Sequence, residues 1–307
     1  MKIVFMGTPD FAGASLAELL KTDHEIVAVY TQPDRPSGRG NRLTPSAVKQ
    51  LALENNIPVY QPQKARAAEV IAELSAMQPD VIVVVAYGQI LPQAILDIPQ
   101  YGCLNVHGSI LPKYRGAAPI HWAILDGERQ TGVTIMQMDE GMDTGAMLAV
   151  AKEDILATDT TATLYERLKW LGAKLLVETL PKLERGELQA IPQDNSQATY
   201  TTLIKRDMEK IDPATTAVAV HNKVRALSGA FVINAAAEPL KIWQTSLEEV
   251  NWGGQPGEVV KVDKLGFVIA TGQGSLRILE VQPANRKRMS AADFANGNKI
   301  TTGYIFK

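Results

Sequence analysis

The sequence contains a single cysteine, Cys103, among its 307 residues. One cysteine excludes an internal disulfide and a cysteine-rich metal cluster, and it fits a reducing compartment. No apolar run reaches the roughly 18 residues that a membrane-spanning helix needs. The stretch from Met1 to Gly7 resembles a strand that enters a glycine turn and is too short for a signal peptide. These features predict a cytoplasmic protein with no membrane partner.

The sequence also lacks the motifs of several large enzyme classes. Its four histidines show neither paired spacing nor an H-E-x-x-H pattern, so we predict no metal. No G-x-S-x-G elbow is present to carry a serine nucleophile. Gly7 and Gly13 are six positions apart with no G-x-G-x-x-G, which disfavours a nicotinamide or flavin dinucleotide. Any catalysis is therefore expected to use other polar groups.

The net charge of −2 is unevenly distributed along the chain. Residues 1–204 carry 17 Lys and Arg against 23 Asp and Glu, whereas residues 205–307 carry 14 against 10. The C-terminal part therefore has an excess of positive charge. Such an excess indicates either contact with a polyanion or simply a solvated surface.

The hydrophobic pattern of the first two thirds predicts an α/β domain. A strand at 3–5, a helix at 12–20 and a strand at 25–31 form a βαβ unit, which implies a parallel sheet. The β-branched run at 81–86 is typical of a central strand buried on both faces. Leucines at helical spacing within 160–184 predict a long helix that packs on the sheet. We therefore predict a Rossmann-like, mostly parallel sheet with helices on both faces.

A second, smaller domain is predicted beyond a polar segment. After one helix, five short strand-like pieces alternate with glycine turns, at 231–233, 240–243, 257–262, 266–270 and 275–281. This pattern is typical of a small β-barrel of the oligonucleotide-binding (OB) kind. We predict a catalytic domain at 1–189, a linker at 190–206 and an OB-like domain at 207–307, in a monomer.

Two basic segments are candidates for contact with phosphates. Residues 32–43 are rich in Pro, Gly and Arg and lack an apolar period, which predicts a surface loop. The candidate side chains are Arg35, Arg39 and Arg42 in this loop, and Arg286, Lys287 and Arg288 after the last predicted strand. Solvated charges and a phosphate grip are both compatible with the sequence.

Polar chemistry is concentrated where the predicted strand at 103–107 ends. Asn105 and His107 are two positions apart, so their side chains leave the same face of the strand. An amide donor beside an imidazole can serve a carbonyl that gains negative charge. Asp143 lies in a second glycine loop, at 139–145, and a carboxylate can orient an imidazole. The alternative for His107 is a hydrogen-bonded histidine of the core.

Direct acyl transfer to an amine would use these three groups without a covalent nucleophile. Asn105 and His107 would hold the oxyanion, and Asp143 would assist proton removal, directly or through water. Ser109 lacks a nucleophile elbow, so we expect it to contact the backbone or a ligand. The turn from Tyr87 to Pro92 follows the strand at 81–86 and should face the same cleft.

The two loops together resemble the folate-dependent formyltransferases. Residues 105–112 read Asn-Val-His-Gly-Ser-Ile-Leu-Pro and residues 139–145 read Asp-Glu-Gly-Met-Asp-Thr-Gly. The family shares an Asn-x-His and a later Asp, and further matching stretches extend the resemblance over nearly the whole chain. The resemblance implies that Asn105, His107 and Asp143 are the catalytic residues and that 10-formyltetrahydrofolate is the co-substrate.

The same resemblance implies the remaining contacts. The folate would be contacted by Ser109, Ile110, Leu111 and Pro112 and by Gln89, Ile90 and Leu91. The acceptor would be the amine of initiator methionyl-tRNA, with Arg39 at the position where the arginine of the family's basic loop enters. The six basic residues named above would then contact the tRNA, and the C-terminal barrel would hold its acceptor arm.

Two alternatives to this acceptor remain open. Gly108 and Tyr114 depart from the family pattern and bring the loop closer to formyltransferases of amino-sugar nucleotides, which share the folate site. Pro213 also departs from the pattern. A non-catalytic RNA-binding module would keep the basic patches but would have no need for the Asn-x-His pair and its aspartate.

Overall fold

The structure is a computed structural model that describes residues 1–37 and 42–307. These residues form two compact units. The first comprises Met1–Pro119, Gln130–Asp154 and Thr163–Thr201, and the second comprises Ile120–Arg129, Ile155–Ala162 and Thr202–Lys307. The last passage from the first unit to the second falls between Thr201 and Thr202, inside the segment predicted as a linker.

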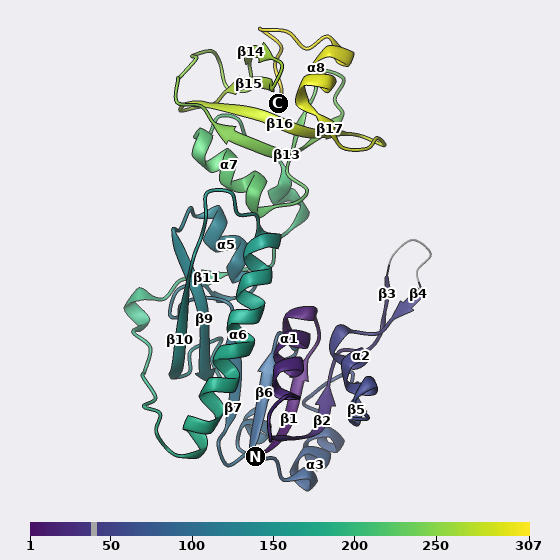
Figure 1. The fold of residues 1–307 in the computed structure, drawn as a ribbon, viewed down its shortest axis with the longest axis vertical. Helices are drawn as coiled ribbons and strands as arrows, with labels where there is room; N and C mark the ends of the chain where they lie inside the picture. The colour runs from purple at the N-terminus through teal and green to yellow at the C-terminus, as the bar shows by residue number, and fades with distance from the viewer. Residues whose placement is uncertain (38–41) are drawn as a thin grey trace. The chain divides into compact units, whose positions relative to one another are not determined.

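The first unit is built on a seven-stranded sheet with the order β10-β9-β7-β6-β1-β2-β5 (Figure 1). Its strands are β1 (Lys2–Gly7), β2 (Glu25–Tyr30), β5 (Val59–Tyr60), β6 (Val81–Val85), β7 (Cys103–His107), β9 (Gln130–Gln137) and β10 (Met147–Asp154). The five neighbouring strands β5, β2, β1, β6 and β7 are parallel to one another. β9 is antiparallel to β7, and β10 is antiparallel to β9. The predicted mostly parallel sheet is confirmed.

The central strand β6 shows why this sequence forms such a sheet. All five of its residues are valine or isoleucine, and all are buried. It pairs in parallel with β1 on one side and with β7 on the other. A strand covered on both faces needs apolar side chains in both directions, and β-branched residues suit the pleated backbone.

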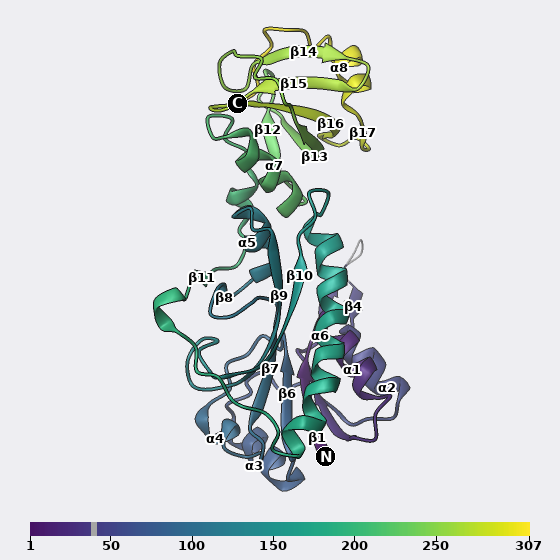
Figure 2. The ribbon, with the colours of Figure 1, turned by 60° about the vertical axis from the view of Figure 1, so that its left-hand side comes forward.

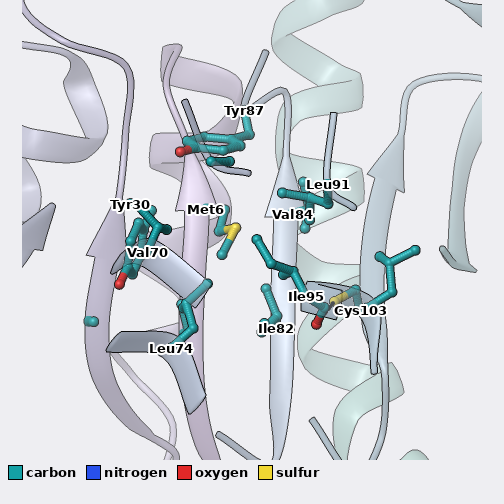
Figure 3. Close-up of a cluster of buried hydrophobic side chains, with 14 residues drawn as sticks. Met6, Tyr30, Val70, Leu74, Ile82, Val84, Tyr87, Leu91, Ile95 and Cys103 are labelled. Carbon is teal, nitrogen blue, oxygen red and sulfur yellow. Dashed lines mark hydrogen bonds between the residues drawn. The ribbon is translucent and has the colours of Figure 1, made fainter. Parts of the chain in front are cut away.

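Helices cover both faces of this sheet, as predicted. They are α1 (Asp10–Leu19), α2 (Ala47–Glu54), α3 (Ala68–Met77), α4 (Gln93–Leu96) and α6 (Thr161–Glu184). Figure 2 shows α1 and α6 on one side of the sheet and α3 and α4 on the other. On the α3 and α4 side, Leu74 and Ile95 pack in one core cluster with Met6 and Ile82 (Figure 3).

The opposite face is closed by α1 and α6. Phe11 of α1 meets Tyr165 of α6 edge-on, with ring centroids 5.4 Å apart. Gly172 allows α6 to approach the sheet, because a Cβ there would lie 3.0 Å from a methyl carbon of Val106 and 3.2 Å from one of Val133. The predicted helix at 160–184 is confirmed, and the observed helix begins one residue later, at Thr161.

The segment 32–43, predicted as a surface loop, contains a short hairpin. β3 (Arg35–Ser37) pairs antiparallel with β4 (Arg42–Thr44). The expectation of a loop without strands was wrong for these residues. Strand pairing here uses main-chain hydrogen bonds, which require no apolar period in the sequence. Arg39 lies outside the described residues.

The second unit is built on an antiparallel sheet with the path β12-β13-β16-β15-β14, and β17 pairs with β16. The strands are β12 (Phe231–Ile233), β13 (Pro239–Leu247), β14 (Val259–Asp263), β15 (Gly266–Ala270), β16 (Ser275–Pro283) and β17 (Met289–Ser290). The five strands predicted from glycine spacing are all present, which confirms the C-terminal β domain. Arg286, Lys287 and Arg288 precede β17, so they do not follow the last strand.

Two helices pack on this second sheet. α7 (Ala217–Ala226) contacts β13 and β16, and α8 (Ala291–Asn298) contacts β14, β15 and β16. The hydrophobic pattern of the sequence predicted α7 but not α8. α8 begins at a side-chain cap: the Ser290 hydroxyl accepts from the Asp293 backbone N–H at 3.0 Å and donates to its carboxylate at 2.7 Å.

The remaining elements are short. They are α5 (Pro119–Leu125), the strands β8 (Arg115–Gly116) and β11 (Tyr200–Thr201), and the 3₁₀ turns at Asn195–Gln197 and Arg206–Glu209. None of the helices in the described parts of the chain is both long and apolar enough to cross a membrane.

Candidate active site

The site lies where β6 and β7 end at the same edge of the sheet. The two strands are parallel neighbours, and Val84 of β6 is opposite Asn105 of β7. Cys103, Asn105 and His107 alternate with Leu104 and Val106, so they share one face of the strand. The turn after β6 and the polar end of β7 are therefore adjacent, as the sequence predicted.

The carboxylate of Asp143 brings the three predicted catalytic residues together. Asn105 Nδ2 donates to Asp143 Oδ1 at 3.2 Å. His107 Nδ1 lies 3.6 Å from Asp143 Oδ2. The backbone N–H of Gly116 also donates to Oδ2, at 2.8 Å. The cluster is largely enclosed, since the side chain of His107 is 6% exposed and that of Asp143 is 17% exposed.

Both ring nitrogens of His107 have a fixed direction. Nε2 lies 2.9 Å from the carbonyl oxygen of Tyr114. A carbonyl only accepts, so Nε2 carries a hydrogen and donates it. Nδ1 is thereby turned toward Asp143. The imidazole is oriented by the backbone on one side and by a carboxylate on the other.

The Asp143 loop is held in an unusual backbone conformation. Asp143 has a φ of 54°, in the left-handed region that non-glycine residues rarely adopt. A Cβ on Gly145 would lie 1.7 Å from the carbonyl oxygen of Gln137, so only glycine fits there. Gln193 Nε2 donates to the carbonyl oxygens of Asp143 at 2.8 Å and of Gly145 at 2.7 Å. One amide therefore holds two carbonyls of this loop.

Residues that were not predicted from the sequence complete the site. Gln193 comes from the segment predicted as a linker, and no pattern in the sequence marks it. β11 of the same segment pairs in parallel with β8. The guanidinium of Arg115 in β8 is 1% exposed and donates to Gln193, Asn195 and Tyr200. The sequence signal for Arg115 was its place just after the loop at 105–112, between Tyr114 and Gly116.

The predicted folate residues after β7 shape the loop itself. The hydroxyl of Ser109, which is fully buried, donates to the Lys113 carbonyl at 2.6 Å. Thr134 donates to the Ser109 carbonyl at 2.7 Å and accepts from the Leu111 N–H at 3.2 Å. Leu111 is buried, whereas Ile110 and Pro112, on either side of it in the chain, are partly exposed.

The three predicted folate residues after β6 differ in their surroundings. Gln89 bridges a neighbouring loop, since its Nε2 donates to the Pro62 carbonyl at 3.0 Å and its Oε1 accepts from the Ala65 N–H at 2.6 Å. Leu91 is buried in the core cluster. Ile90 is 89% exposed. An isoleucine so exposed beside the catalytic edge offers an apolar surface to a ligand.

The predicted basic contacts are spread over both units. Arg35 is exposed in β3, with Nη2 3.4 Å from Gln32 Oε1. Arg42 belongs to β4. Arg286, Lys287 and Arg288 are exposed in the second unit. The guanidinium carbon of Arg288 lies 3.3 Å from the centroid of the Trp243 ring, a cation–π contact.

Within residues 1–37 and 42–307, no group of three or more His, Cys, Asp or Glu residues is arranged to hold a metal ion.

Comparison with known sequences gives matches over almost the whole chain. A family model described as "Formyl transferase" matches residues 1–180, and one described as "Formyl transferase, C-terminal domain" matches residues 203–299. A methionyl-tRNA formyltransferase of Hydrogenovibrio crunogenus is 48% identical over 304 residues, covering 98% of this chain and 97% of that protein. One of Trichlorobacter lovleyi is 47% identical over 306 residues, covering 99% and 96%.

Comparison with solved structures shows the same fold at lower identity. WlaRD, a sugar 3N-formyl transferase, aligns with a TM-score of 0.68 and 21% identity over 94% of this chain and 99% of its own. HypX of Aquifex aeolicus in complex with tetrahydrofolic acid aligns with a TM-score of 0.62 and 20% identity, over 98% of this chain and 48% of its own. At these identities the likeness concerns the fold.

Proposed function

The chain belongs to the formyl transferase family, and on this premise we propose that it transfers the formyl group of 10-formyltetrahydrofolate to the α-amino group of initiator methionyl-tRNA, for translation initiation. The observation that carries the proposal is the meeting of Asn105, His107 and Asp143 at the end of β7. The acceptor is supported by the relatives named methionyl-tRNA formyltransferase, which are 45–48% identical over nearly the full chain.

Asn105 and His107 supply donors to the formyl oxygen as the amine attacks. The amide nitrogen of Asn105 has two hydrogens, of which one is bound to Asp143 and the other is available for the oxyanion. His107 serves through Nδ1, because Nε2 is engaged with the Tyr114 carbonyl. In this role Nδ1 carries a hydrogen, beside the Asp143 carboxylate 3.6 Å away. Preorganised donors in an enclosed site stabilise developing negative charge strongly.

Asp143 assists removal of the proton from the attacking amine. One of its oxygens accepts from Asn105 and the other from the Gly116 N–H, so each retains a lone pair. The carboxylate can take the proton directly or through one water. Its backbone anchoring by Gln193 keeps it within reach of both donors. As the intermediate collapses, the bond from the formyl carbon to N10 of the folate breaks, and N10 takes up a proton as tetrahydrofolate leaves.

The residues near the catalytic edge suit a folate. A planar heterocycle needs an apolar wall with a few polar groups beside it. The exposed side chain of Ile90 can supply that wall, together with the partly exposed Ile110 and Pro112. The other predicted folate residues support these contacts by holding the two loops in place: Ser109, Leu111, Gln89 and Leu91.

The tRNA is proposed to contact basic side chains of both units. Arg35 in the hairpin, and Arg286 and Lys287 in the second unit, are exposed. Arg288 is stacked on Trp243. Phosphate contacts by such residues release counterions and give binding a steep dependence on salt. The positive excess in residues 205–307 supports the same assignment.

The features of this site that favour a sugar-nucleotide acceptor are Gly108 and Tyr114, which leave the proposed chemistry unchanged. The sugar 3N-formyl transferase with a similar structure is 21% identical, which is evidence about the fold. The relatives above 45% identity carry the other acceptor in their names.

The deciding experiment compares two amine acceptors with the same formyl donor. Purified protein and 10-formyltetrahydrofolate are incubated with initiator methionyl-tRNA or with a 4-amino sugar nucleotide. We expect formyl transfer to the tRNA and none to the sugar. The Asp143→Asn variant serves as the inactive control. Transfer to the sugar nucleotide and not to the tRNA would overturn the proposal.

A further inference from the structure

Arg115 is a buried cation whose hydrogen-bond partners carry no negative charge. Nε and Nη2 donate to Gln193 Oε1 at 3.0 and 2.9 Å, Nη2 also donates to Asn195 Oδ1 at 2.8 Å, and Nη1 donates to the Tyr200 hydroxyl at 3.0 Å. No carboxylate forms an ion pair with it in the part of the chain that the structure describes. Burying a cation beside neutral partners is costly, so this arrangement calls for a compensating role.

The guanidinium determines which way the amide of Gln193 points. Arg115 can only donate, so the atom of Gln193 that faces it must be the oxygen. The amide nitrogen therefore faces the other way, toward the carbonyl oxygens of Asp143 and Gly145. These carbonyls can only accept. The amide thus has one orientation that satisfies all four contacts.

Asp143 is consequently tied to β8 at two points. Its carboxylate accepts from the Gly116 N–H, and its carbonyl is linked through Gln193 to the side chain of Arg115. Arg115 and Gly116 are consecutive residues of the same short strand. A residue at φ 54° persists only where its surroundings hold it, and these two links are such a hold.

We propose that Arg115 and Gln193 are positioning residues that hold Asp143 in its working conformation. Gln193 fixes the backbone of the 139–145 loop, and Arg115 fixes Gln193. Neither side chain needs to touch a substrate. The inference deepens the proposed function and rests on it for the catalytic role of Asp143. Loss of this hold should slow turnover, because a small displacement of a catalytic group has a large effect on rate.

The test variant is Gln193→Glu. It has nearly the same shape, keeps the oxygen that faces Arg115 and provides the missing negative charge, but it removes both donors to the loop carbonyls. The introduced carboxylate stays ionised beside Arg115. Its second oxygen would face the carbonyl oxygens of Asp143 and Gly145, which repel it, so the loop loses its hold. We expect a kcat lower by about tenfold or more, with KM values within about twofold of wild type.

The matched control is Asn195→Asp. Asn195 also accepts from Arg115, and no hydrogen bond joins its side chain to the 139–145 loop among the described residues. This variant adds the same charge beside the same guanidinium without removing a loop donor. We expect wild-type kcat. A loss equal to that of Gln193→Glu would overturn the proposal, because charge and not the loop contacts would then be responsible.

A further measurement separates this inference from the function on which it rests. Hydrogen exchange of the 139–145 loop in the free protein requires no substrate, and it should be faster in Gln193→Glu but not in Asn195→Asp. Wild-type exchange and kcat in Gln193→Glu would overturn the inference. Failure of the wild type to formylate methionyl-tRNA would defeat the proposed function and leave the exchange result to decide the positioning role.

A second variant covers the case in which Gln193→Glu fails to fold. Arg115→Lys keeps the charge, but a single ammonium cannot reproduce the planar fork that bonds Gln193, Asn195 and Tyr200 together. It should lower kcat and loosen the loop in the same manner. Wild-type kcat and exchange in Arg115→Lys would contradict the role of Arg115.

Discussion

The amide nitrogen of Asn105 donates to Oδ1 of Asp143 across 3.2 Å, although 38 positions separate the two residues. β9 is antiparallel to β7, and the loop that follows it returns to the face of β7 that carries Asn105 and His107. The fold thereby brings together the proposed catalytic residues from the end of β7 and from the loop after β9.

Removing either oxyanion donor should reduce turnover severely. We expect Asn105→Ala and His107→Ala each to lower kcat by about a hundredfold or more, the usual effect of losing one donor to an oxyanion. Steady-state formylation of methionyl-tRNA measures this. His24→Gln is the control, because His24 precedes β2 at the opposite edge of the sheet and should leave kcat unchanged. Near-normal turnover in His107→Ala would contradict the mechanism.

Removing basic side chains of the second unit should weaken use of tRNA and spare the folate. We expect Arg286→Ala and Lys287→Ala to raise KM for methionyl-tRNA and each to reduce the log–log salt slope of binding by about 1. KM for the formyl donor should stay constant. Lys174→Ala is the control, since this exposed lysine of α6 is not among the predicted contacts. A salt slope equal to that of wild type would argue against phosphate contact.

The second unit should lose stability in acid through His221. Burial, followed by the charge of Arg225, lowers the pKa of His221 to about 4, from 6.5 in the unfolded chain. The unfolded chain therefore binds a proton that the folded chain excludes as the pH falls from 6.5 to 4, and the free energy of unfolding decreases through that window. Urea unfolding at pH 7, 5.5 and 4.5 measures the slope. His221→Asn should flatten it.

The control for this pH dependence is a change on the same helix that removes no titratable group. Val218→Ala on the exposed side of α7 should keep the wild-type slope. An equal slope in wild type and His221→Asn would assign the acid sensitivity to other residues.

Cys103 should resist thiol reagents in the folded protein. Its side chain is buried, so a reagent cannot reach the sulfur. Burial also raises the pKa of its thiol to about 12, so very little of the reactive thiolate is present at pH 8. We expect no modification by a disulfide reagent at pH 8 until urea unfolds the chain, and then one group per molecule. A cysteine placed on the surface by Lys174→Cys should react at once. Rapid modification of the native wild type would contradict this burial.

Much of the fold follows from local patterns that the sequence displays directly. The valine and isoleucine run of β6 specifies a central strand, because few other structures bury consecutive β-branched side chains on both faces. The glycine-separated strands of the second unit were also predictable. The helix α8 and the hairpin β3–β4 were not, because short elements depend on caps and pairing partners more than on periodicity.

The sequence by itself determined how the proposed catalytic pair, Asn105 and His107, is arranged. The two-residue spacing of Asn105 and His107 on a strand places both side chains on one face, whatever the rest of the chain does. Only the tertiary structure decided how Asp143 reaches them and what holds it there. Gln193 and Arg115 act through hydrogen bonds between short polar segments far apart in the chain. Such bonds impose no period on the sequence, so they become visible only once the chain is folded.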